Sequence, residues 1–172
     1  GGKHESPPNL NPKKWKHDCN ELLNEMNANP LSVPFREPVS EIEFPDYHRY
    51  ITTPMDLSTV RESLHIGDYG SPMDFQKDVA LIFKNSKEYN TDPKSKVLSM
   101  TIKLEDHFNE KIFDIIEDWR RTNRRLKMAK IKHKNKKAAM TGGAGGSGQS
   151  KGKGKGKGKG KGQSNLIRKT KS

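Results

Sequence analysis

Residues 97–119, VLSMTIKLEDHFNEKIFDIIEDW, carry the pattern that decides the fold. Apolar or small side chains recur there at helical spacing over about six turns, and no segment of the chain alternates for long as a strand does. We expect these residues to form the last and longest helix, beginning near Asp92-Pro93 or Lys94. Its buried stripe would consist of Val97, Thr101, Leu104, Phe108, Ile112, Ile115 and Trp119.

Three shorter segments upstream show the same spacing and predict three further helices. The first would be capped by Asn11-Pro12 and end at Asn29-Pro30, the second would run from Asp56 to Gly67, and the third would start at Ser71-Pro72. Their stripes would be Trp15, Cys19, Leu22 and Met26; Leu57, Val60 and Leu64; and Phe75, Val79, Ile82, Phe83 and Ser86. An all-α antiparallel four-helix bundle is the predicted fold class.

The connection between the first two helices is unusually long for a compact domain. Residues 27–55 contain five prolines, so no long helix can cross them, and loops of this length are usually functional or disordered. Eight apolar or aromatic side chains in the loop need cover, which argues against disorder: Val33, Phe35, Val39, Ile42, Phe44, Tyr47, Tyr50 and Ile51. Most can simply pack onto the bundle, but proline and aromatic rings together also form the rigid wall that a small pocket needs.

Charge divides the chain into two parts. Residues 120–172 hold 19 of the 33 basic residues and no acidic one, so the first 119 residues carry 14 basic against 21 acidic residues. Only 30% of all residues are hydrophobic, too few for the whole length to fold compactly. The composition predicts a mildly acidic domain followed by a strongly basic tail.

Composition also indicates the cellular compartment of the protein. Cys19 is the only cysteine and falls on an apolar helical stripe, which indicates a buried structural thiol in a reducing compartment. No stretch approaches the roughly 20 apolar residues that span a membrane, and the polar start does not resemble a signal peptide. The Gly-Gly start, without an initiator Met, is typical of a fragment.

Tyr89-Asn90 closes the third predicted helix and opens a short polar loop. A side-chain amide at a helix exit can donate and accept hydrogen bonds without carrying charge, which suits a neutral amide guest such as acetylated lysine. The alternative is a plain C-cap, because Asn tolerates the left-handed conformation.

Five short strings in fixed order resemble the bromodomain family over residues 12–120. They are Val33-Pro34-Phe35, Pro38-Val39, Pro45-Asp46-Tyr47, Thr53-Pro54-Met55-Asp56 and Tyr89-Asn90. The resemblance implies a left-handed four-helix bundle and a pocket for acetyl-lysine. Within the family, Val60-Arg61-Glu62-Ser63-Leu64 and Gly67-Asp68-Tyr69 are most similar to the second bromodomain of the nuclear WD-repeat and bromodomain proteins, the pleckstrin-homology-domain-interacting protein and its relatives.

The resemblance also implies a role for each pocket residue. Asn90 would donate from its side-chain NH2 to the acetyl carbonyl, Tyr47 would hold the same oxygen through a water, and Val97 would be the gatekeeper. The walls would be formed by Pro34, Phe35, Val39, Phe44, Ile42 and Tyr89. Val33 stands where the family usually has Trp, which implies a wider or wetter pocket. Asn90 restores the commoner family pattern, since some relatives in the subfamily carry Thr there.

Charge selection would follow from desolvation, because no carboxylate is expected on the pocket floor and burying an unmodified ammonium is costly. Acidic side chains expected at the rim would steer the basic flanks of a histone tail, unless each is ordinary solvated surface. They are Glu37, Glu41, Glu43, Asp46 and Asp92.

The chain is thus predicted to comprise a flexible segment (1–11), a bromodomain (12–120), a basic helical extension or cluster (121–141) and a disordered Gly/Lys-rich basic tail (142–172). Within the extension, residues 127–137 suit a nuclear localisation signal or a nucleic-acid patch. Residues 120–172 would contact DNA or RNA phosphates non-specifically, the alternative being a solubilising spacer. The tail contacts would come from Lys151, Lys153, Lys155, Lys157, Lys159 and Lys161.

The predicted function is binding of acetylated histone tails by a monomeric nuclear domain that recruits its parent protein to chromatin. The alternative is a nucleic-acid-binding protein that acts mainly through its basic tail. An enzyme has little support, because the six histidines show no metal-ligand spacing with Cys19 and no nucleophile or phosphate-loop motif occurs. No cofactor, metal or membrane partner is expected.

Overall fold

The computed structural model describes residues 10–142. Six elements follow in order: α1 (Lys14–Ala28), the 3₁₀ helix η1 (Pro30–Phe35), α2 (Tyr47–Tyr50), α3 (Leu57–Ile66), α4 (Pro72–Tyr89) and α5 (Lys96–Thr141). The predictions for the flexible start, for the disordered tail beyond residue 142 and for the six lysines from Lys151 to Lys161 lie outside the described residues.

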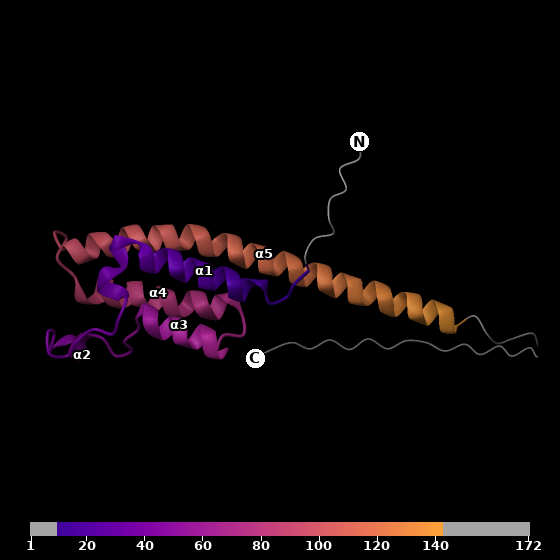
Figure 1. Ribbon diagram of the computed structural model, residues 1–172, viewed down its shortest axis with the longest axis horizontal. Helices are drawn as coiled ribbons and strands as arrows, with labels where there is room; N and C mark the ends of the chain where they lie inside the picture. The colour runs from indigo at the N-terminus through magenta and orange to yellow at the C-terminus, as the bar shows by residue number, and fades with distance from the viewer. Residues whose placement is uncertain (1–9, 143–172) are drawn as a thin grey trace, which may run out of the picture.

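The four long helices form an antiparallel bundle (Figure 1). Helix α1 packs on α5 and α3, and α4 packs on α5 and α3, so each helix has two principal neighbours. Both η1 and α2 lie at the end of the bundle where α1 and α4 finish and α5 begins (Figure 1). The predicted all-α four-helix bundle is confirmed for the described part of the chain.

The core lies between the four helices. Three aromatic rings fill its middle: Phe108 from α5 contacts Phe75 and Phe83 from α4, with centroid distances of 6.1 and 5.9 Å. All three side chains are fully buried. The predicted stripes of the first three helices are buried as expected. On α5 the pattern shifts by one residue, because Ile116 is buried while Ile115 and Trp119 pack only at the edge of the core.

Two predicted helix starts are wrong by two or three residues. Asn11 does not cap α1, since its Oδ1 accepts from Lys13 N at 2.9 Å in a turn before the helix. Helix α5 starts after Ser95, whose Oγ accepts from Leu98 N at 3.2 Å. Asp92 is used one turn earlier, where its side chain accepts from Lys94 N. In both places a local side-chain turn takes the polar group that would otherwise cap the helix.

Helix α3 begins and ends where its sequence predicts. The Asp56 carboxylate accepts from Ser58 N at 3.0 Å and Thr59 N at 3.3 Å, which satisfies two free amides of the first turn. Gly67 ends the helix with φ of 87°, in the left-handed region that a Cβ disfavours.

Replacing Gly67 by Ala is expected to lower the free energy of unfolding by about 1–2 kcal/mol. The loss of stability would come from backbone strain at positive φ, because no atom lies within 4 Å of the added Cβ. Denaturant unfolding of Gly67→Ala beside Gly70→Ala tests this, since Gly70 has no positive φ and a Cβ there meets only ordinary contacts. Equal stability of the two variants would contradict the assignment.

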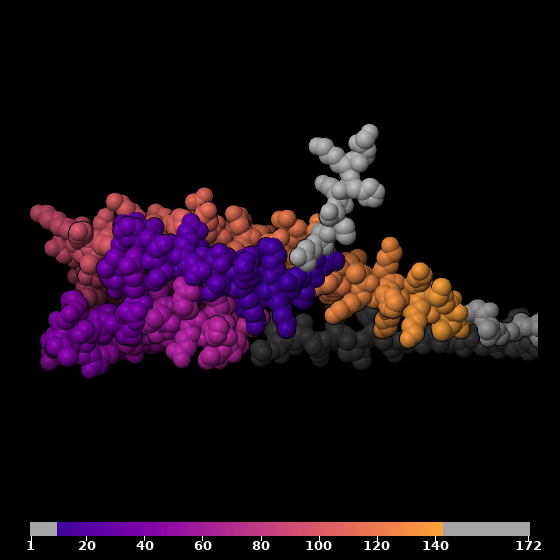
Figure 2. Space-filling model, in the orientation of Figure 1, coloured from indigo at the N-terminus to yellow at the C-terminus, as the bar shows by residue number. Residues whose placement is uncertain are grey.

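Beyond Trp119, α5 leaves the bundle and continues to Thr141 as a single projecting helix (Figures 1 and 2). From residue 127 to residue 141 every side chain is exposed. None of the described helices is long and apolar enough to cross a membrane.

Candidate acetyl-lysine pocket

One wall of the candidate site is built by η1. Asn29 Oδ1 accepts from Leu31 N at 3.0 Å and starts this short helix, which places Phe35 edge-on to Phe83 of the core, 6.4 Å between ring centroids. The main chain then turns toward α3, because Arg36 O accepts from Ser58 N at 3.1 Å. The proline-rich loop is therefore held on the bundle by the packing of Phe35 and by the hydrogen bond to the Arg36 carbonyl.

A second wall is aromatic and joins the loop to α4. Tyr47, from α2, is buried and lies 5.0 Å from Tyr89, centroid to centroid, while Phe44 lies edge-on to Tyr89 at 6.1 Å. Tyr89 donates its hydroxyl to Asp46 Oδ1 at 2.9 Å, and this bond raises the pKa of Tyr89. Burial raises the pKa of Tyr47, so its hydroxyl is protonated at neutral pH.

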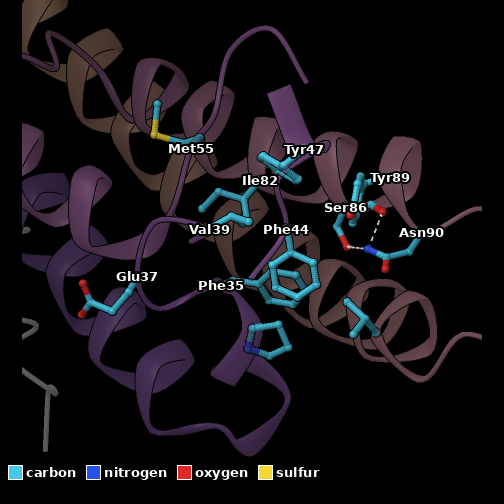
Figure 3. A pocket seen from close by; sticks show the side chains of 12 residues that line it. Phe35, Glu37, Val39, Phe44, Tyr47, Met55, Ile82, Ser86, Tyr89 and Asn90 are labelled. Atoms are coloured by element: carbon cyan, nitrogen blue, oxygen red, sulfur yellow. Dashed lines mark hydrogen bonds between the residues drawn. The ribbon is translucent and has the colours of Figure 1, made fainter. Parts of the chain in front are cut away.

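Asn90 is the C-cap of α4. Its main-chain N–H donates to Ser86 O at 2.8 Å, and its side-chain Nδ2 donates to the same oxygen at 2.9 Å and to Ser86 Oγ at 3.3 Å (Figure 3). Asn90 thus ends the helix as the alternative interpretation expected, but with φ of −97° rather than in the left-handed conformation. The amide is held by the last turn of α4 at the edge of the cavity.

These walls enclose a cavity of about 130 Å³ with mostly apolar sides (Figure 3). It brings together eight of the nine residues that the sequence predicts for the pocket. Those eight are Pro34, Phe35, Val39, Phe44, Tyr47, Tyr89, Asn90 and Val97.

Ile42 is the exception and its prediction is wrong. The side chain is 94% exposed and does not line the cavity. A tight turn explains this, because Ser40 O accepts from Phe44 N at 2.9 Å and Ser40 Oγ from Glu43 N at 3.3 Å. The short connection therefore bends outward at Ile42. Val33 is also largely exposed, at 58%, and does not line the cavity.

Four lining residues were missed: Glu37, Met55, Ile82 and Ser86. A signal for two of them is present in the sequence, since residues 82, 86 and 90 are spaced by four and share one face of α4. Glu37, expected at the rim, borders both the cavity and a neighbouring depression. Its carboxylate lies apart from Asn90 (Figure 3).

Two other acidic residues of this region already have partners. Asp46 accepts from Tyr89, as described, and Glu41 Oε1 lies 2.6 Å from His48 Nε2 on the exposed side of the loop. Within residues 10–142 no group of three or more His, Cys, Asp or Glu side chains could hold a metal ion. Cys19 is fully buried, and burial raises the pKa of its thiol to about 12, so it is not a poised nucleophile.

The fold and the site together define a known class of domain. Residues 19–102 match the family model described as Bromodomain. The solved bromodomain of human BAZ1A is similar in structure, with a TM-score of 0.56 and 27% identity over 67% of this chain and 97% of that chain. The chain therefore contains a bromodomain.

The curated relatives are much longer proteins. Tyrosine-protein kinase BAZ1B of Danio rerio is 40% identical over 104 residues, which are 60% of this chain and 7% of that protein. Histone acetyltransferase GCN5 of Debaryomyces hansenii is 41% identical over 96 residues, 56% of this chain and 21% of that protein. The chain spans a small part of each, and the resemblance to the WD-repeat subfamily stays a prediction.

Proposed function

We propose that the cavity binds the acetylated side chain of lysine in histone tails. The observation that carries this proposal is the neutral amide of Asn90 at the edge of a small apolar cavity. An acetyl-lysine head group is a flat amide with a methyl cap and no charge. Its methyl group suits the apolar walls, and its carbonyl suits an N–H donor.

Asn90 would supply that donor. An amide nitrogen has two N–H groups, and the bond to Ser86 O, at 2.9 Å, needs only one of them. The contact between Asn90 Nδ2 and Ser86 Oγ is longer, at 3.3 Å, and therefore weaker. A guest carbonyl would replace this contact. Tyr47, protonated and lining the same cavity, would hold the carbonyl through an ordered water.

Unmodified lysine would be rejected because its ammonium would lose water among apolar side chains. Glu37 would offset part of this desolvation cost only at the mouth of the cavity. There its carboxylate would attract the basic residues around the acetylated position. We expect weak binding, with Kd on the order of tens to hundreds of micromolar, or about −5 to −6 kcal/mol.

An array of histone peptides, each present with and without one acetyl group, tests the proposal directly. The full chain should bind a subset of the acetylated peptides and none of their unmodified partners. Binding that follows peptide charge rather than acetylation would contradict it. The proposed role of the protein is recruitment of its parent protein to acetylated chromatin in the nucleus, by a monomeric domain.

The projecting end of α5 supports a second activity, contact with nucleic acid. Between Arg120 and Lys137 the helix holds ten basic residues and no acidic one over about 26 Å. Like charges three and four residues apart weaken an isolated helix, so a polyanion would stabilise it. This segment lies at the opposite end of the bundle from the cavity, about 35 Å along α5 from Val97 (Figure 1). One molecule could therefore hold an acetylated tail and DNA phosphates at separate places.

Replacing Lys130, Lys134 and Lys137 by Gln should weaken duplex DNA binding and reduce the slope of log K against log salt by about 1 for each lysine that contacts a phosphate. Titrations of full-length variants at several salt concentrations measure that slope. The control carries Gln at Lys77, Lys103 and Lys111, which are exposed on the bundle. A control as impaired as the test variant would show that only net charge matters. Affinity for acetylated peptide should not change.

A further inference from the structure

Four polar groups form a chain between Asn90 and the first turn of α5. Asn90 Nδ2 lies 3.3 Å from Ser86 Oγ, Ser86 Oγ lies 2.6 Å from Thr101 Oγ1, and Thr101 Oγ1 lies 2.7 Å from Val97 O. The two hydroxyl groups belong to buried residues, Thr101 at 0% and Ser86 at 6% exposure. The chain ends on the main-chain carbonyl of the same Val97 whose side chain lines the cavity.

The direction of each bond in this chain is fixed by its last member. A carbonyl only accepts, so the one hydroxyl proton of Thr101 lies on the bond to Val97 O. Thr101 Oγ1 must then accept, and the proton of Ser86 lies between the two hydroxyl oxygens. Ser86 Oγ therefore has only lone pairs left for Asn90, and the amide atom that faces it must be Nδ2 and not Oδ1.

We infer that Thr101 is a positioning residue: because it accepts the hydroxyl proton of Ser86, it keeps the Asn90 amide in the orientation needed to donate to a guest. The inference rests on the proposed function and names a residue behind the cavity wall, Thr101, that controls it. Ser86 O alone also favours Nδ2, but the hydroxyl chain removes the competing arrangement in which a serine proton attracts Oδ1. Thr101 is fully buried, so no solvent molecule can take the place of its hydroxyl.

Thr101→Val is the informative single change. Val keeps the shape of Thr but removes the acceptor of the Ser86 hydroxyl, which becomes a buried donor in need of a partner. Asn90 Oδ1 is the neighbouring acceptor, so the amide would be drawn toward the reversed orientation. We expect affinity for an acetylated Gly-Lys-Gly peptide to fall about five- to tenfold. Thr101→Ser keeps the hydroxyl and should bind within about twofold of the wild type.

Ser86→Ala provides the decisive comparison. It removes the unsatisfied hydroxyl itself, while the carbonyl of residue 86 still accepts from Asn90 Nδ2. We expect Ser86→Ala combined with Thr101→Val to recover most of the affinity that Thr101→Val alone loses. A packing role for Thr101 predicts the opposite, since removing a second side chain cannot restore packing.

Calorimetry with the acetylated peptide and the side-chain ¹H–¹⁵N signals of Asn90 in the full chain are the two readouts. The signals should shift in Thr101→Val and return to the wild-type position in the double variant. Wild-type affinity of Thr101→Val, or a double variant as weak as Thr101→Val, would overturn the inference while Asn90→Ala still abolishes binding. Retained binding by Asn90→Ala would instead overturn the proposed function itself.

Discussion

Asn90→Ala is expected to abolish measurable binding of acetylated histone peptides and to leave the fold intact. The side chain supplies the proposed donor to the acetyl carbonyl, and no other amide lines the cavity. Once the amide is gone, a guest carbonyl would be desolvated without its direct donor, which costs about 1–3 kcal/mol. For a ligand bound by only about 5–6 kcal/mol, that loss leaves about 2–5 kcal/mol, which is a Kd of about 0.2 mM or weaker.

Asn109→Ala is the matched control for this experiment, because Asn109 is exposed on α5, about three turns beyond Val97, and does not line the cavity. Calorimetry should give the wild-type Kd for Asn109→Ala and no heat for Asn90→Ala. Circular dichroism should show the same helix content in both. An unchanged affinity of Asn90→Ala would refute the site.

Phe108→Ala should lower the free energy of unfolding by about 3–5 kcal/mol, the largest stability effect that we expect from one substitution. The ring is fully buried between Phe75 and Phe83, so its loss leaves a cavity that the surrounding helices cannot close without separating from each other. Phe83 also supports Phe35, which lines the proposed acetyl-lysine site, so peptide affinity should fall as well.

The control is Phe113→Ala on the same helix, where the ring is 62% exposed. It should change the free energy of unfolding by no more than about 0.5 kcal/mol. Denaturant unfolding of both variants decides the question. Similar small losses would mean that the rings of α4 and α5 do not form the centre of the core.

Helical periodicity predicted the four long helices because burial in the core requires apolar side chains on one face of each helix. The residues that cap a helix lie next to it in the sequence, so they can mark its ends. Asp56 and Gly67 mark the ends of α3 in the sequence as clearly as in the structure. The errors arise where two local solutions compete. The side chains of Asn11 and Asp92 could each cap a helix or close a turn, and in the structure each closes a turn. Where the buried stripe of α5 ends, Ile115 and Ile116 both suit the helical spacing, and only packing against the other helices selects Ile116.

The candidate site could be predicted from the sequence only in part. Its walls could be assigned from ordered motifs, whereas the outward turn at Ile42 depends on hydrogen bonds of Ser40 that no periodicity reveals. The link between Ser86 and Thr101 joins residues 15 positions apart on two helices. Each falls on a predicted core stripe as a polar residue among apolar ones, which is the only trace of the link in the sequence.

The most direct test of the central claim is a titration of the ¹⁵N-labelled full chain with two peptides that differ only in one lysine acetyl group. The account predicts that the acetylated peptide shifts the side-chain signals of Asn90 and the main-chain signals of residues around the cavity, and that the unmodified peptide leaves them in place. Acetyl-dependent shifts confined to the basic end of α5, or equal shifts from both peptides, would contradict it.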